Sequence, residues 1–150
     1  MSGTGHTVKS YEEEMQSLND NLVMMGSLTE NQMADAMAAV IKVDKESVDK
    51  IVKNDGKINE LRSTIDNQIT TVLVKRAPMA VDLRITISTM KISHDLERIG
   101  DLAKSVAKKV KPLPVDLPDE LIGSLRRLGD LVQKQLKDAL DAYLNRSKDK

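Results

Sequence analysis

The spacing of apolar residues limits what this chain can fold into more than any other feature. From about Ser10 to Ile41, apolar side chains recur at steps of three and four, which is the period of an amphipathic helix. The same period runs through residues 48–75, 78–109 and 120–146. We therefore expect an all-α protein built from four long helices.

The composition favours helices that pack on helices. Of the 150 residues none is Phe or Trp and two are Tyr, so the core has to be built from Leu, Ile, Val, Met and Ala. There is no Cys, which excludes disulfides, thiolate zinc sites and cysteine nucleophiles and fits a reducing compartment. No run approaches the ~18 apolar residues of a membrane span, and the start lacks the apolar segment of a signal peptide. We expect a cytoplasmic protein that at most associates peripherally with a membrane.

Charge and motifs argue against two classes of function. The 23 Lys and Arg residues equal the 23 Asp and Glu residues, which removes the concentrated positive field that nucleic-acid binding requires. Only His6 and His94 are available as histidine bases, and the chain has no Gly-rich phosphate loop or nucleophile elbow. We expect neither a nucleic-acid partner nor an enzyme.

The first part of the chain is expected to be one bundle. Residues 1–9 are predicted to be disordered, and residues 10–110 to form an antiparallel three-helix bundle. Pro78 suits the first turn of the third helix, where its missing amide proton costs nothing. Gly56, next to Asp55, weakens the second helix, so we expect one helix that can kink there.

Prolines separate this bundle from the fourth helix. Pro112, Pro114 and Pro118 predict a stiff, extended linker over residues 111–119. The fourth helix should follow over residues 120–146, with a short tail at 147–150.

The fourth helical segment matches the first one, residue by residue. The sequence from Met25 to Met37 aligns with that from Leu128 to Leu140, so that Gly26 falls on Gly129. An internal repeat of this kind predicts a three-helix repeat unit, of which the second copy stops after its first helix. The apolar face of that helix would then pack on the first bundle, on another chain or on a further part of a longer protein.

Two acidic residues on the third helix are candidate ligands for a cation. Glu97 and Asp101 lie one turn apart and repel each other unless a cation lies between them. Helical geometry places them opposite an apolar side of the helix formed by Ile85, Ile92, Leu96, Ile99, Ala103, Val106 and Val110. A second polar stripe on the second helix consists of Asp55, Asn59, Arg62 and Asp66.

Spacing alone does not favour a metal at these acids. Lys104 and Lys108 extend the same stripe and Arg98 is close to Asp101, so an ordinary solvated face with weak ion pairs explains the pattern. His94 is in the stripe and is explained as a half-exposed histidine.

Several motifs resemble one family. The segment Pro78-Met79-Ala80-Val81-Asp82-Leu83-Arg84, then Lys91-Ile92 and Leu96-Glu97-Arg98-Ile99-Gly100-Asp101, is similar to the PhoU family of regulators of bacterial phosphate uptake. The resemblance covers residues 10–144. It implies two tandem three-helix bundles, each with a Glu/Asp-x-x-x-Asp motif that gathers metal ions. A full member would continue past Lys150 with two more helices and a second acidic motif.

The resemblance also implies a site and partners. Glu97 and Asp101 would be the first metal ligands and Asp55 and Asn59 further ones, for a divalent or trivalent ion such as Mg, Mn, Fe or Zn. The implied function is negative regulation of phosphate uptake and phosphate-starvation signalling. Its partners would be the ATPase subunit of a phosphate ABC transporter and a sensor histidine kinase, and a homodimer is expected. The alternative is a metal-free helical adaptor that recruits a partner through its apolar fourth helix.

Overall fold

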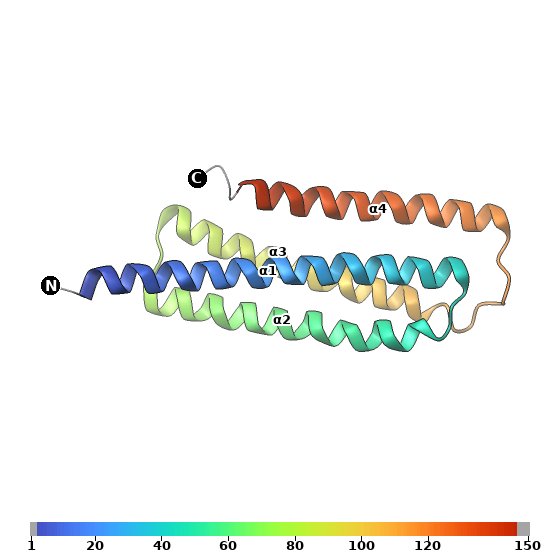
Figure 1. Cartoon of the computed structure of the whole chain (residues 1–150), viewed down its shortest axis with the longest axis horizontal. Helices are drawn as coiled ribbons and strands as arrows, with labels where there is room; N and C mark the ends of the chain where they lie inside the picture. The colour runs from blue at the N-terminus through green and yellow to red at the C-terminus, as the bar shows by residue number, and fades with distance from the viewer. Residues whose placement is uncertain (1–2, 147–150) are drawn as a thin grey trace.

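Four helices make up the protein (Figure 1). The computed structural model describes residues 3–146, apart from the side chains at positions 3, 4, 6 and 146. The helices are α1 (Gly3–Lys42), α2 (Ser47–Arg76), α3 (Ala80–Lys108) and α4 (Asp119–Arg146). Helices α1 to α3 pack as an antiparallel bundle, and α4 lies along α1 in the opposite direction. The all-α class and the bundle with one additional helix are confirmed.

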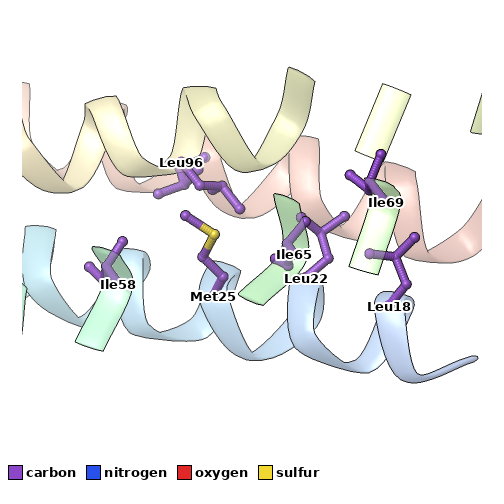
Figure 2. Packing of buried hydrophobic residues seen from close by; sticks show 8 residues of the cluster. Leu18, Leu22, Met25, Ile58, Ile65, Ile69 and Leu96 are labelled. Carbon is purple, nitrogen blue, oxygen red and sulfur yellow. The ribbon is translucent and has the colours of Figure 1, made fainter. Parts of the chain in front are cut away.

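The core is aliphatic, as the composition required. One of its two clusters joins all four helices, and Figure 2 shows members of this cluster pointing toward one another between the ribbons. Full burial of each such side chain stabilises the fold by about 1.5–3 kcal/mol. The buried members of this cluster are Leu18, Leu22, Met25, Ile58, Ile65, Ile69, Leu96 and Leu136. A second cluster, rich in alanine, includes Ala36, Ala39, Ala103 and Ala107 and holds the other end of the bundle together.

The face that α3 turns to the core differs from the predicted one. Its buried residues are Thr86, Thr89, Ser93, Leu96, Gly100, Ala103 and Ala107, whereas Val106 is exposed. The hydroxyls can be buried because each bonds to a carbonyl of its own helix: Thr86 Oγ1 donates to Asp82 at 2.8 Å and Thr89 Oγ1 to Ile85 at 2.9 Å. The core face is therefore lined by small residues, and Glu97 lies at its edge.

Helix α1 is longer than predicted. It begins at Gly3, so residues 3–9 are helical and the prediction of disorder there is wrong; residues 1 and 2 lie outside the described part. Extending a formed helix costs far less than starting one, and no proline interrupts these residues. Arg76 at the end of α2 anchors this region by donating to Ser10 Oγ and to Glu14 Oε1, each at 3.0 Å.

Pro78 lies in the connection between α2 and α3, so the prediction that it belongs to the first turn of the third helix is wrong. Ala77 adopts a left-handed conformation (φ 42°) that ends α2, and Met79 is extended (φ −122°, ψ 157°). The helix therefore begins at Ala80, and Pro78 lies in the connection and not in the first turn. Gly56 lies inside an uninterrupted α2, as expected.

The first half of the linker before α4 forms turns, so the prediction of an extended chain is wrong there. Residues 109–113 form successive turns, in which Val110 N donates to Ala107 O at 3.0 Å and Leu113 N to Val110 O at 3.1 Å. Val110 is fully buried, which draws the start of the linker against the bundle. The predicted tail at 147–150 lies outside the described residues.

Helices α1 and α4 contact each other through equivalent positions. A Cβ added to Gly26 would lie 3.1 Å from Leu140 Cδ1, and one added to Gly129 would lie 2.8 Å from Met37 Cε. Gly129 is the repeat counterpart of Gly26, and Leu140 is that of Met37. The contact of Gly26 with Leu140 is therefore equivalent to the contact of Gly129 with Met37. Such a pair of equivalent contacts is expected when two copies of one helix pack antiparallel. The absence of a side chain at both glycines allows the close approach.

Candidate functional site

A buried carboxylate lies where α1, α2 and α3 meet. Asp55 of α2 is 2% exposed. Its Oδ2 accepts a hydrogen bond from Lys104 Nζ of α3 at 2.7 Å, and its Oδ1 accepts one from Gln32 Nε2 of α1 at 2.9 Å. Asn59 Nδ2 donates a long bond of 3.5 Å to Oδ2. A buried charge needs this degree of pairing, because leaving it unpaired costs several kcal/mol.

Gln32 joins the three helices. The same Nε2 group that bonds to Asp55 also donates to the Gly100 carbonyl of α3 at 2.9 Å. Gly100 permits this approach, because a Cβ there would lie 3.1 Å from Ile58 Cδ1 and 3.5 Å from Asp55 Oδ1. The other end of the amide, Gln32 Oε1, is buried without a hydrogen-bond partner.

Lys104 is the cation of the site. Its Nζ lies between Asp55 and Asp101, 2.7 Å from the first carboxylate and 3.4 Å from the second. The hydrogen bond to Asp55, supported by the negative charges of both carboxylates, raises the pKa of Lys104 above the ordinary value for lysine. The ammonium group therefore stays charged where the two acids converge.

A second set of charges continues along the same two helices. Arg62 of α2 forms an ion pair with Glu97 of α3 and lies 3.6 Å from Asp66, which in turn lies 3.2 Å from His94 Nε2. The four side chains are 18–43% exposed, and pairs of this kind contribute at most about 1 kcal/mol each. We call the row formed by Asp55, Lys104, Asp101, Arg62 and Glu97 the α2–α3 seam.

The four predicted metal ligands take different places in this seam. Glu97 pairs with Arg62, and Asp101 pairs with Lys104. Asp55 shares Lys104 with Asp101, whereas Asn59 is exposed and turns its amide nitrogen to Asp55. Sequence reasoning placed Arg62 and Lys104 on the polar stripes of the two helices, but it did not assign them partners across the helices. It missed Gln32, which carried a usable signal because it is a polar residue on the apolar stripe of α1.

The arrangement does not fit a metal ion. Within residues 3–146 no group of three or more His, Asp or Glu side chains is placed to hold one. Oxygen-ligated cations need several such ligands, and here the carboxylates are neutralised by Lys104 and Arg62. The ion-pair explanation of the stripe describes the observed contacts, and the metal stays a prediction.

The outer face of α4 is a second candidate surface. Leu121, Leu128 and Val132 are 45%, 58% and 37% exposed. In the repeat they correspond to Leu18, Met25 and Thr29 of α1, each of which is 1% exposed or less because α2 and α3 cover that face. Among the described helices α4 packs mainly on α1, with Tyr143 Oη reaching Thr89 Oγ1 of α3 at 3.3 Å. The side of α4 that corresponds to the core side of α1 is thus open. No described helix is long and apolar enough to span a membrane.

Fold and seam together define a helical-bundle protein in which buried polar groups join the helices. The PhoU domain model matches residues 22–110, and the chain belongs to the PhoU family. The resemblance noted in the sequence is thereby confirmed.

Relatives match almost all of this chain. The phosphate-specific transport system accessory protein PhoU homolog of Caulobacter vibrioides is 42% identical over 141 residues, which are 93% of this chain and 61% of the relative. The homolog of Clostridium acetobutylicum is 35% identical over 96% of this chain and 66% of its own length. The crystal structure of PhoU from Pseudomonas aeruginosa matches with a TM-score of 0.80 and 33% identity, over 90% of this chain and 65% of that one. The chain thus spans about three fifths of the length of the first of these relatives.

Proposed function

We propose that this chain is an accessory component of phosphate-specific transport that restrains phosphate uptake and phosphate-starvation signalling. The observation that carries the proposal is the 42% identity to a protein named as such an accessory factor, over 93% of the chain. The family is one of accessory proteins, so the proposed role is regulatory and involves no catalytic step. The proposed location is the cytoplasm, at the inner side of a membrane-bound transporter.

The proposed partners are the ATPase subunit of a phosphate ABC transporter and a sensor histidine kinase. A rigid bundle regulates such partners by presenting fixed surfaces. The open face of α4 offers Leu121, Leu128 and Val132, and the exposed Leu131 lies beside them. Apolar patches of this kind are typical of interaction sites. We propose that this face receives an amphipathic helical element of a partner or of a second copy of the chain.

The seam contributes by keeping the bundle rigid. Gln32, Asp55 and Lys104 come from three different helices, and their bonds hold these helices at one relative position. Since Lys104 and Arg62 already neutralise the acids, the proposal includes no step that passes through a metal. Elemental analysis of the purified chain tests this directly: one or more ions per chain would show that a metal displaces these cations.

The regulatory proposal is tested in a bacterium that lacks its own PhoU homolog and carries a reporter for the phosphate-starvation response. Expression of this chain should lower the reporter signal in phosphate-rich medium. Leu128→Asp combined with Leu131→Asp should abolish the repression and the co-purification of the ATPase subunit. Val74→Asp is the matched control, because Val74 is an apolar residue that is 78% exposed on α2. Repression that survives the α4 variant would contradict the role of this face.

The open face of α4 also favours a second function, that of a metal-free helical adaptor acting outside phosphate transport. The adaptor would bind its partner through α4 without changing the reporter. Loss of partner binding with an unchanged response to phosphate would therefore favour the adaptor over the transport regulator.

A further inference from the structure

The connection between α2 and α3 presents apolar side chains to solvent. Met79 is 81% exposed and Val81 is 57% exposed, and Ala77 and Ala80 beside them are exposed as well. The connection lies at the end of the bundle where α1 begins (Figure 1). We call residues 77–81, which include the first two residues of α3, the Met79 tip.

The backbone of the tip is strained and holds Met79 outward. Ala77 (φ 42°) and Ala80 (φ 52°) both adopt the left-handed conformation, which is unfavourable for a residue with a Cβ. Met79 between them is extended (φ −122°, ψ 157°). Strained residues of this kind cluster at functional sites, where the strain preorganises a contact. A strained connection that exposes an apolar side chain gains nothing within the chain itself, so its benefit lies in a contact with another molecule.

The free charges that flank the tip are positive. The sequence has no Asp or Glu between Asp66 and Asp82. Lys75 and Arg84 are exposed on the two sides of the tip, and neither forms an ion pair with another described residue. Asp82 lies close to Tyr11 of α1, and burial together with the Asp82 carboxylate raises the pKa of the Tyr11 phenol. A surface that complements the tip is therefore acidic around an apolar centre.

A protein pocket fits the tip better than a lipid surface does. A fluid bilayer accepts apolar side chains in any conformation, so it gains nothing from a fixed backbone. A pocket in a protein does gain, because a side chain that is already held in place loses less freedom on binding. The unbranched, polarizable side chain of Met79 also adapts well to an irregular apolar pocket.

We propose that the Met79 tip inserts Met79 into an apolar pocket with an acidic rim on the sensor histidine kinase. The inference rests on the proposed function, in which two partners need two surfaces and the open face of α4 receives the ATPase subunit. Leu121 and Leu128 of that face lie near the start of α4, at the opposite end of the bundle from the tip (Figure 1). The 29 residues of α3 separate the two ends by about 40 Å, so both partners can bind at once.

Binding of two purified proteins to the full chain tests the assignment. The probes are the cytoplasmic part of the sensor kinase and the ATPase subunit from one bacterium, and surface plasmon resonance gives their affinities. Met79→Asp should weaken kinase binding at least about tenfold and leave ATPase binding within about twofold, because a charge does not enter an apolar pocket. Val74→Asp is the matched control, since Val74 is 78% exposed on α2 outside the tip, and it should change neither affinity by more than about twofold.

Further variants separate the backbone, the charges and the side chain. Ala77→Gly with Ala80→Gly keeps Met79 but frees the backbone, and it should weaken kinase binding by about threefold or more. Lys75→Glu with Arg84→Glu should weaken it at least about tenfold at low salt, mainly through a slower association rate. Met79→Leu conserves volume and should keep the affinity within about threefold. Circular dichroism confirms that each variant is folded.

Several results would overturn the proposal. Kinase binding that is unchanged in Met79→Asp would do so, as would equal losses of kinase and ATPase binding. A native chain that binds the ATPase subunit and represses the reporter without binding the kinase would exclude the role of the tip but not the proposed function, whereas binding of neither protein would exclude both. If Met79→Asp instead abolished self-association or binding to phospholipid vesicles, the tip would belong to a second copy or to a membrane, and the kinase would be excluded.

Discussion

The α2–α3 seam and a polar hollow between α1 and α2 use charge differently. We call the second feature the α1–α2 hollow; its polar lining consists of Asn31, Gln32, Asp35, Lys50, Asn54 and Lys57. In the seam each acid has a base within reach: Asp55 and Asp101 meet Lys104, and Glu97 meets Arg62. In the hollow the charged groups of Lys50, Lys57 and Asp35 remain unpaired. Paired charges at a buried position stabilise a fold, whereas unpaired charges at the surface contribute little to its stability. The comparison therefore predicts where substitution of a charged residue is costly.

The largest effect is expected from Lys104→Met in the seam. It leaves the Asp55 carboxylate buried without its cation, and the expected loss is about 2–4 kcal/mol of unfolding free energy, with Gln32 still bonded. Urea denaturation measures the loss. Lys108→Met, an exposed neighbour one turn further on, is the control and should change stability by less than about 0.5 kcal/mol.

A double-mutant cycle sharpens this expectation. Asp55→Asn combined with Lys104→Met should cost less than the sum of the two single changes, because the second substitution removes the unpaired charge left by the first. Additive costs would mean that the two side chains do not interact. The charges of the seam would then contribute as little to stability as the unpaired charges of the hollow.

The seam should also make stability depend on alkaline pH. Asp55, through its hydrogen bond, raises the pKa of Lys104, so the stabilisation is fully present below the ordinary lysine pKa and is lost as pH rises through the raised value in the folded chain. The difference in unfolding free energy between the native chain and Lys104→Met should be constant from pH 7 to about 10 and shrink above it. A difference that does not change up to pH 12 would contradict the ion pair.

A pair of glycines compares the solvent side of α2, where Gly56 lies, with the contact between α2 and α3, where Gly100 lies. Gly56→Ala should stabilise the chain by about 1 kcal/mol, because nothing lies within 4 Å of the added carbon and alanine favours a helix. Gly100→Ala should give no gain or a loss, since its carbon would lie 3.1 Å from Ile58 Cδ1 beside Asp55. Thermal unfolding measures both, and equal gains would show that the seam is not tightly packed.

The smallest effect is expected in the hollow. Lys50→Met combined with Lys57→Met should change the unfolding free energy by no more than about 0.5 kcal/mol, because neither lysine has an ion-pair partner to lose among the described residues. Urea denaturation is the measurement. A loss above about 1 kcal/mol would give these lysines a structural role like that of Lys104.

The helices could be predicted from the sequence because their apolar period is local. Helices α2 and α4 begin and end within one residue of the predicted limits, and α3 lacks only Pro78 and Met79 at its start. The core face of α3, in contrast, could not be predicted from the apolar period. Thr86, Thr89 and Ser93 count as polar in a pattern, but in the folded helix their hydroxyls bond to its own carbonyls and the side chains become small core residues.

In the candidate site, too, the local pattern predicted some features and the packing of the helices decided others. Asp55, Glu97 and Asp101 were found as acids that need a cation, and the motif around Glu97 and Asp101 identified the family. The pattern placed Lys104 near Asp101, three positions away on the same helix, but it did not show which cation Asp55 and Glu97 would meet. Lys104 lies 49 positions from Asp55, and Arg62 lies 35 positions from Glu97. Pairs at such separations are made by the packing of α2 on α3.

The sequence by itself determined that this chain is helical, that its core is aliphatic and that its first and fourth helices are copies of one pattern. These properties depend on spacing and residue type along a single helix. Only the tertiary structure decided which polar groups are paired and which stay free. Gln32 illustrates the reason: one end of its amide joins α2 and α3 while the other end has no partner, and this follows from the relative position of three helices.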